Sequence, residues 1–186
     1  DNLAAIFYGR DFRVPPVLFS AIVTAMPRLY FLDLSRIVPT SSIAVLDSLD
    51  MGCVSMGLRF FADGKLSEKR FRRARLAARL QLEPVRSKFL KTGWDHAVGS
   101  SGMVRAIADL ARELDPAESA ITLPAVEEMI TATVRAERLS DLNLPPLTED
   151  RIAVLPGGLA ILGELLEVFE IKGLRAAEGG LREGLL

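Results

Sequence analysis

The fold is decided by a stretch near the middle of the chain, WDHAVGSSGMVR, residues 94–105. Its apolar alternation predicts a short strand, its glycines and serines predict a turn, and the residues after the turn predict the start of a helix. A turn of this kind leaves several backbone N–H groups unpaired and directed at one point, and the helix adds the positive end of its dipole. The stretch therefore predicts a binding site for an anion such as a phosphate group.

Four turn residues and one arginine are the candidate ligands of this anion. Gly99 and Gly102 allow the backbone to approach a phosphate without an intervening Cβ atom. Ser100 and Ser101 add hydroxyl donors, and Arg105 places a guanidinium one turn into the helix. A Gly-Ser turn is also an ordinary connection between a strand and a helix, and the local sequence leaves that alternative open.

Composition indicates one globular α/β domain. With 186 residues, of which 49% are hydrophobic and 25% charged, the chain can bury a core of its own. The formal net charge of -1 provides no overall attraction to nucleic acid or to a membrane. The single cysteine, Cys53, and the single histidine, His96, exclude a disulfide within these residues and a zinc site built from several such side chains. A lone cysteine between apolar neighbours predicts a core residue in a reducing cytoplasm.

We expect neither a signal peptide nor a membrane span. The chain starts with Asp1, Asn2 and Leu3, which lack the basic character of a secretory leader. The apolar run at residues 17–26 is too short to cross a bilayer as a helix.

A long helix is predicted before the central turn. Ser67 is a good N-cap, and apolar residues recur at steps of three and four over residues 71–89, which places them on one face. Pro84 predicts that this helix is kinked or divided in two.

The other faces of this helix are strongly basic. Residues 65–91 contain ten Lys or Arg against two Glu, a local net charge of +8. The basic faces predict a contact surface for a polyanion, with Arg72, Arg75 and Arg79 as the candidate residues. An ordinary solvated helix face is the equally weighted alternative.

The rest of the chain predicts further helices and short strands. Helices are expected at residues 103–114, at about 122–138, from 148 and at 159–169, with the LPGG sequence at 155–158 interrupting the last two. Residues 43–61 predict a strand that ends near Asp50 and then a short helix, residues 173–178 a short strand, and residues 179–180 a turn into a last helix. Residues 1–48 show no steady period, so strands, or a helix and a strand, are both open there.

Four motifs follow one another along the chain: LDSLDMGCV at 46–54, GSSGMVR at 99–105, VLPGGLAIL at 154–162 and GLREGLL at 180–186. This series resembles the exopolyphosphatase and guanosine pentaphosphate phosphohydrolase family. The resemblance implies an actin-like, ribonuclease-H-type fold with two lobes around a phosphate-binding cleft. Residues 46–186 would form most of the second lobe, and residues 1–45 a poorly matched remnant of the first lobe and the start of the second.

The resemblance also implies roles for the residues of the turn. Gly99, Ser100, Ser101 and Gly102 match the family's second phosphate loop, and Arg105 matches its basic position. The residue after Gly102 is a methionine where the family usually has a threonine, so one hydroxyl donor is missing.

Two further pairs match positions at the family's cleft. Gly157 and Gly158 match a glycine pair that lines the cleft, with close helix packing as the alternative explanation. Arg182 and Glu183 match the closing motif, where a local ion pair or helix cap is the alternative to substrate contact.

The first lobe has no clear counterpart in this sequence. The family has a Gly-Ser-Asn turn near its N-terminus and an Asp-Ile-Gly-Gly-Gly-Ser-Thr-Glu hairpin before the first of the four motifs. This chain has FYGRD at residues 7–11 and LDLSRI at residues 32–37 instead. The catalytic carboxylates therefore stay unassigned.

The implied function is that of an exopolyphosphatase-type phosphohydrolase. Such an enzyme releases terminal phosphate from inorganic polyphosphate or guanosine pentaphosphate with Mg2+ as cofactor. Because the first phosphate loop is missing, a non-catalytic module that binds phosphate or polyanions is the alternative. Nucleic acid is a weaker candidate ligand, since few aromatic residues lie near the basic helix for base stacking. An isolated second lobe would expose apolar surface, so a homodimer is also expected.

Overall fold

In the described part of the chain, a four-stranded sheet is accompanied by five α-helices, as expected for the α/β class. The structure is a computed structural model that describes residues 3–8, 21–23, 47, 49–94, 96–99, 101–117, 119–145 and 147–177. The strands are β1 (Leu3–Tyr8), β2 (Ala21–Val23), β3 (His96–Gly99) and β4 (Leu174–Ala176). The helices are α1 (Cys53–Phe61), α2 (Glu68–Thr92), α3 (Gly102–Leu114), α4 (Leu123–Arg135), α5 (Glu149–Val168) and a short 3-10 helix (Leu139–Asp141).

The sheet fixes the end of β3 from both sides. The strand order is β2-β1-β3-β4, with β3 antiparallel to β1 and parallel to β4. Gly99, the last residue of β3, pairs with Ala5 on one side and Ala176 on the other. Its carbonyl also accepts a 2.7 Å hydrogen bond from the N–H of Ala177. The turn that follows β3 therefore starts from a defined position, and the predicted strand, turn and helix are confirmed.

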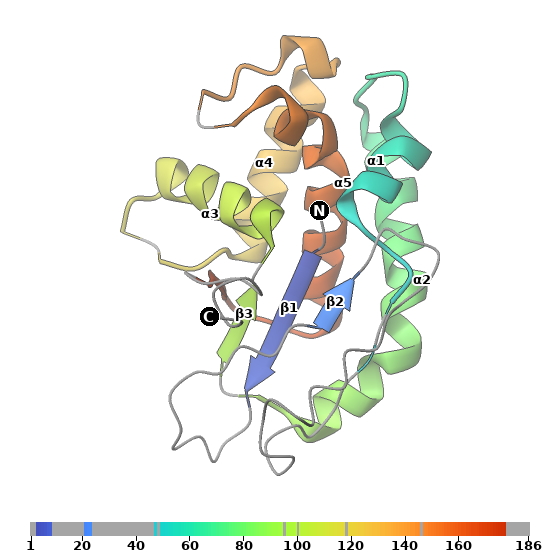
Figure 1. The fold of residues 1–186 in the computed structure, drawn as a ribbon, viewed down its shortest axis with the longest axis vertical. Helices are drawn as coiled ribbons and strands as arrows, with labels where there is room; N and C mark the ends of the chain where they lie inside the picture. The colour runs from blue at the N-terminus through green and yellow to red at the C-terminus, as the bar shows by residue number, and fades with distance from the viewer. Residues whose placement is uncertain are drawn as a thin grey trace, which may run out of the picture.

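Helix α5 is the central support of the other helices. It packs against α1, α2, α3 and α4. Figure 1 shows α5 passing behind the sheet, with α1 and α2 on one side and α3 and α4 on the other. Every residue from 155 to 166 is buried, as expected for a helix that is covered on all sides.

Helix α5 runs unbroken from Glu149 to Val168, so the interruption expected at residues 155–158 was wrong. Gly157 allows α5 to approach α1 closely, because a Cβ atom there would lie 2.8 Å from the backbone nitrogen of Gly57. The intrinsic cost in a helix is about 1 kcal/mol for glycine and about 3 kcal/mol for proline. Burial of the surrounding apolar side chains outweighs this cost.

Helix α2 begins after Ser67, as expected, and the Ser67 side chain accepts a hydrogen bond from the N–H of Arg70. The helix continues through Pro84 to Thr92, so the predicted division in two was wrong. Pro84 has no N–H for the carbonyl of Leu80, one turn earlier. Both residues are exposed, and water can satisfy that carbonyl.

The remaining elements agree with the sequence in type but not always in extent. Cys53 is a buried core residue, as expected, and burial raises the pKa of its thiol. Helix α4 ends at Arg135 rather than near residue 138, because Glu137 adopts a left-handed φ of 60°.

One further difference lies in the first third of the chain. Asp47, Leu49 and Asp50 form no strand, contrary to the prediction of a strand that ends near Asp50, and the rest of that predicted strand, residues 43–46 and 48, falls outside the described residues. Strands β1 and β2 lie in the region whose elements the sequence left open. The turn and last helix expected from residue 179 fall outside the described residues.

Candidate phosphate-binding site

The turn between β3 and α3 has the geometry of a helix N-cap. Ser101 precedes α3 with φ -84° and ψ 155°, and its Oγ accepts a 3.1 Å hydrogen bond from the N–H of Val104. The N–H groups of Gly102 and Met103 lie in the first turn, where a helix offers them no carbonyl. Helix α3 thus directs unpaired donors and its positive dipole end toward the space beyond β3. Ser100 lies outside the described residues.

Ser101 retains one hydrogen-bond donor. The residue is 5% exposed, and within the described residues its hydroxyl is used only as the acceptor for Val104. A serine hydroxyl has one proton to donate in addition to its lone pairs. This proton is therefore available for an anion at the helix N-terminus.

The structure gives Gly99 a packing role. A Cβ atom at Gly99 would lie 2.7 Å and 2.9 Å from the two γ-methyl groups of Val104 and 3.1 Å from the side chain of Leu174. The absent side chain thus allows Val104 to pack beneath the turn. This is a different reason for glycine from the close approach of a phosphate that the sequence suggested.

At Gly102 the space for a side chain is filled by Arg151, which lies in the first turn of α5. A Cβ atom at Gly102 would lie 2.8 Å from both terminal nitrogens of Arg151. One of these nitrogens donates a hydrogen bond to the carbonyl oxygen of Gly102. The guanidinium thus lies against the first turn of α3 and retains further N–H donors.

Arg151 is the site residue that the sequence analysis missed. It lies 49 positions from Gly102 along the chain, and no short motif joins them. One signal was present: a cation in the first turn of a helix opposes the helix dipole, which favours acidic residues there. Glu149 and Asp150, the preceding residues, follow that preference, and Arg151 departs from it.

Arg105 lies on the outer side of α3, one turn from its start, and is exposed. No ion pair within the described residues includes it. Its position agrees with the expected basic residue of the turn, and its contact with an anion remains a prediction.

The two glycines of the α5 pair pack against different elements, and Gly158 is the one that lies behind the turn. A Cβ atom at Gly158 would lie 2.6 Å from Cγ of Met103, a residue that is 1% exposed. Gly157 packs against α1. Both glycines are buried, which favours the helix-packing explanation, and their role in lining a cleft remains a prediction. Met103, where the family usually has threonine, fills the space that Gly158 leaves. Arg182 and Glu183 fall outside the described residues.

Two of the three candidate polyanion residues are engaged within the fold. Arg75 pairs with Glu164 at 2.7 Å, with Glu127 at 2.6 Å and with Glu167 at 2.9 Å. Arg79 pairs with Glu164 and Glu167, both at 2.6 Å. Glu164 is 3% exposed, so this network joins α2 to the buried side of α5.

Arg72 differs from these two arginines. It is exposed and pairs with Glu68 of the same helix at 3.4 Å, a surface contact of small energy. Of the three candidates, Arg72 is the one that a polyanion could reach without breaking a buried ion pair.

The ion-pair network shifts the pKa values of its members. The hydrogen bond from Arg79 lowers the pKa of Glu167. The hydrogen bonds to Glu164 and Glu167 raise the pKa of Arg79. Both side chains therefore stay charged at neutral pH.

No three histidine, cysteine or carboxylate side chains in the described residues lie together as a metal site. None of the helices in the described segments combines the length and the apolar character of a membrane span.

The fold defines the class of protein as an actin-like α/β domain. A solved structure of the Aquifex aeolicus Ppx/GppA phosphatase, type II variant, matches with a TM-score of 0.61 and 22% identity, covering 74% of this chain and 46% of that chain. A second Aquifex aeolicus PPX-GPPA enzyme structure gives a TM-score of 0.60 and 22% identity with the same coverage. At this identity the similarity shows the fold alone, and it confirms the expected fold class.

The chain belongs to the Ppx/GppA phosphatase family, whose model matches residues 35–186. The resemblance stated from the four motifs is thereby confirmed, and the match begins before the first of them. A protein of Haemophilus influenzae named as a putative exopolyphosphatase is 38% identical over 141 residues, covering 75% of this chain and 43% of its own length. A guanosine-5'-triphosphate,3'-diphosphate pyrophosphatase of Aeromonas hydrophila is 38% identical over 146 residues, covering 78% of this chain and 29% of its own length. The chain thus spans less than half the length of these curated relatives.

Proposed function

We propose that this chain forms the phosphate-binding lobe of a phosphohydrolase that releases terminal phosphate from inorganic polyphosphate, guanosine pentaphosphate or both. Family membership and the names of the two relatives support the reaction class. One observation supports the location of the site. Donors from Ser101, Gly102 and Met103 and the guanidinium of Arg151 meet at the first turn of α3.

The chemistry of this site is charge neutralisation and positioning. Oxygens of the transferred phosphoryl group would accept hydrogen bonds from the backbone N–H groups of Gly102 and Met103 and from the Ser101 hydroxyl. Arg151 and Arg105 would offset the negative charge that develops as water attacks in line. Phosphoryl transfer depends mainly on such positioning and electrostatic stabilisation. The carboxylate that activates the water is not assigned among the described residues.

A divalent cation, Mg2+, is the proposed cofactor. When bound, Mg2+ would neutralise and orient phosphate oxygens. The described residues do not fit a complete site for it, because no three suitable side chains lie together.

The leading test compares two arginines on α3. Arg105→Ala should lower kcat/KM for release of phosphate from polyphosphate by about tenfold, since it removes one charge from the transition state. Arg112→Ala is the matched control, because Arg112 lies two turns further along α3 and its one ion pair among the described residues is with Asp109 at 2.8 Å. Both substrates, polyphosphate and guanosine pentaphosphate, should be assayed with Mg2+.

Binding is measured separately from turnover. Titration with tripolyphosphate should shift the backbone amide signals of Gly102 and Met103 in an NMR spectrum. Unshifted amides, or an equal loss of activity in the Arg112 control, would remove the proposed site. Shifted amides without turnover would support the alternative function, a module that binds phosphate without catalysis.

For the basic helix we propose a contact with the distal part of a polyphosphate chain, made by Arg72. Arg72→Glu should raise KM for long polyphosphate while leaving KM for tripolyphosphate unchanged, and added salt should reduce the difference. Arg112→Glu changes the net charge equally on another helix. If both variants raise KM alike, the effect belongs to overall charge and the contact is excluded. For Arg75 and Arg79 the same role would require their ion pairs to open.

We further propose a cytoplasmic location, which suits Cys53, a buried thiol and the one cysteine of the sequence. Assembly as a homodimer and weak affinity for nucleic acid remain predictions. Size-exclusion chromatography with light scattering tests the first, and competition between DNA and polyphosphate tests the second.

A further inference from the structure

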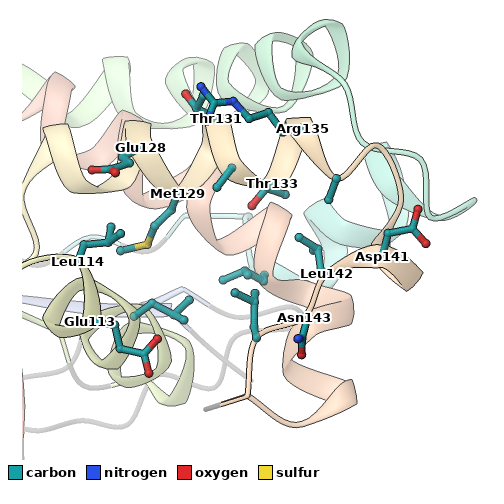
Figure 2. Close-up of a pocket in the computed structure, with 15 residues that line it drawn as sticks. Glu113, Leu114, Glu128, Met129, Thr131, Thr133, Arg135, Asp141, Leu142 and Asn143 are labelled. Carbon is teal, nitrogen blue, oxygen red and sulfur yellow. The ribbon is translucent and has the colours of Figure 1, made fainter.

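A pocket of about 670 Å³ lies between the C-terminal halves of α3 and α4 and the segment that follows the 3-10 helix. Figure 2 shows side chains from these elements surrounding it. Its apolar lining includes Leu110, Met129, Leu142, Leu144 and Leu155. The volume falls within the range of sites for small organic molecules.

Thr133 gives this pocket an unsatisfied polar group. The residue is 3% exposed and lines the pocket, and its hydroxyl has no hydrogen bond within the described residues. Thr131, two positions earlier in α4, instead donates to the carbonyl of Glu127 at 2.9 Å. Figure 2 shows Thr133 on the side of α4 that faces Leu142. A buried hydroxyl without a partner is costly, so a ligand that bonds to it would gain that energy.

The charges around the pocket favour a cation. Glu113, Glu128 and Asp141 line it, against a single cation, Arg135. No ion pair within the described residues includes any of these four. The pocket also lies along the C-terminal halves of α3 and α4, whose dipoles have their negative ends there.

We propose that this pocket binds a small organic cation with an apolar body, of the alkylamine or arylalkylamine class. The apolar part would contact Leu110, Met129 and Leu155, and the ammonium would lie near the carboxylates of Glu113 and Glu128. The hydroxyl of Thr133 would bond to a polar atom of the ligand. The site is separate from the first turn of α3, and the proposal does not depend on the proposed reaction.

The test uses the methionine methyl groups as reporters. The chain has five methionines, and Met129 lines this pocket whereas Met103 lies at the phosphate turn. With 13C-labelled methionine methyls, titration with 2-phenylethylammonium should shift the Met129 signal to saturation and leave the Met103 signal in place. The anion 3-phenylpropionate has a similar shape and should bind at least tenfold more weakly.

Three variants assign the interaction. Thr133→Val and the double variant Glu113→Gln, Glu128→Gln should each weaken binding by about tenfold, the loss typical of a hydrogen bond or close charge on a charged ligand. Thr133→Ser keeps the hydroxyl and should bind as the original chain does. The double variant Glu68→Gln, Glu83→Gln removes two exposed carboxylates on α2 and is the control for net charge.

The proposal is overturned if the anion binds as well as the cation, if Met129 does not shift, or if the Glu113→Gln, Glu128→Gln variant binds as well as the Glu68→Gln, Glu83→Gln control. Should Thr133→Val fail to fold, Thr133→Ser and the carboxylate variants still decide the outcome. Binding lost in Thr133→Val and retained in Thr133→Ser supports the assigned hydroxyl. Equal affinity of the folded Thr133→Val variant would overturn that assignment.

Discussion

Two groups of arginine side chains differ in what neutralises them. On α2, carboxylates of α4 and α5 hold Arg75 and Arg79 at 2.6 to 2.9 Å. At the start of α3, Arg151 bonds to a carbonyl oxygen, and no ion pair within the described residues includes Arg151 or Arg105. A guanidinium enclosed by carboxylates is already neutralised, whereas one that faces only dipoles keeps its charge for a ligand. Positive charge in a sequence therefore indicates an anion site only where the fold leaves that charge uncompensated.

Helix α5 supports both groups. Its first turn supplies Arg151, its Gly158 packs behind Met103, and its second half supplies Glu164 and Glu167. The two groups can thus be perturbed separately by substitutions in a single helix. Stability should depend on one end of α5 and anion affinity on the other.

The largest effect is expected for Glu164→Gln. This change leaves Arg75 and Arg79 beside a buried neutral amide, and breaking a buried ion pair by removing one partner costs about 3 kcal/mol or more. Urea unfolding should show the loss in the free energy of unfolding. Glu68→Gln removes the carboxylate of an exposed pair with Arg72 and should change the free energy by less than about 0.5 kcal/mol. A loss for Glu164→Gln as small as this control would mean that the arginines of α2 are not bound into the fold.

A smaller loss is expected for Gly157→Ala, where α5 crosses α1. The new Cβ atom would lie 2.8 Å from the nitrogen of Gly57 and closer still to the carbonyl oxygen of Cys53, and backbone atoms cannot move aside easily. Overpacking outweighs the gain in helix propensity, giving a net loss of about 2 kcal/mol in the free energy of unfolding.

Gly163→Ala is the matched control in the same helix. Its Cβ atom would be 3.5 Å from its nearest neighbour, Val126, which is ordinary contact. Thermal unfolding should therefore show Gly163→Ala stabilised by up to about 1 kcal/mol. If both variants shift stability in the same direction, close packing does not explain the glycine at position 157.

The third prediction compares one arginine from each group for its effect on anion affinity and on stability. Arg151→Gln should weaken tripolyphosphate binding about tenfold, or about 1.4 kcal/mol, and leave stability nearly unchanged. Arg75→Gln should lower stability and leave tripolyphosphate affinity as it was. Calorimetric titration and urea unfolding of both variants measure the four values. If Arg75→Gln lowers the affinity for tripolyphosphate and Arg151→Gln does not, the anion is bound by the arginines of α2 and not by those at the start of α3.

The parts of this molecule that were predictable depend on signals close together in the sequence. The strand, turn and helix around residues 96–114 follow from alternation, glycine and the N-cap Ser101, all within a few positions. The family and its fold followed from motifs of seven to nine residues. The basic run on α2 was equally visible, but its partners Glu127, Glu164 and Glu167 lie 52 to 92 positions away. No local pattern indicates which arginines these carboxylates neutralise.

Two errors of the sequence-based prediction, the expected break in α5 and the missed Arg151, have the same physical origin. Proline and glycine at 156–158 carry a strong local preference against helix, yet packing on α1 and α3 overrides it. Arg151 joins the phosphate turn because α5 packs against α3, and its contact with Gly102 is a product of tertiary structure. Propensity is a weak prior wherever an element is buried on all sides, and α5 is such an element.

The smallest effect expected is the contribution of Glu167, a carboxylate paired with Arg79, to the pH dependence of stability. The hydrogen bond from Arg79 lowers the pKa of Glu167 in the folded chain below its ordinary value of about 4.5. A carboxylate with a lowered folded-state pKa stabilises the fold above about pH 4.5, and this contribution disappears as pH falls through the folded-state value. The Glu167 side chain is 43% exposed, so solvent limits the contribution to less than about 1 kcal/mol. The free energies of unfolding of the original chain and of Glu167→Gln, measured in urea, should therefore differ at pH 6 and converge once the pH lies below the folded-state pKa of Glu167. A difference that persists at low pH would show that Glu167 stabilises the contact between α2 and α5 through packing. The charges of Arg75 and Arg79 would then be neutralised mainly by Glu164 and Glu127.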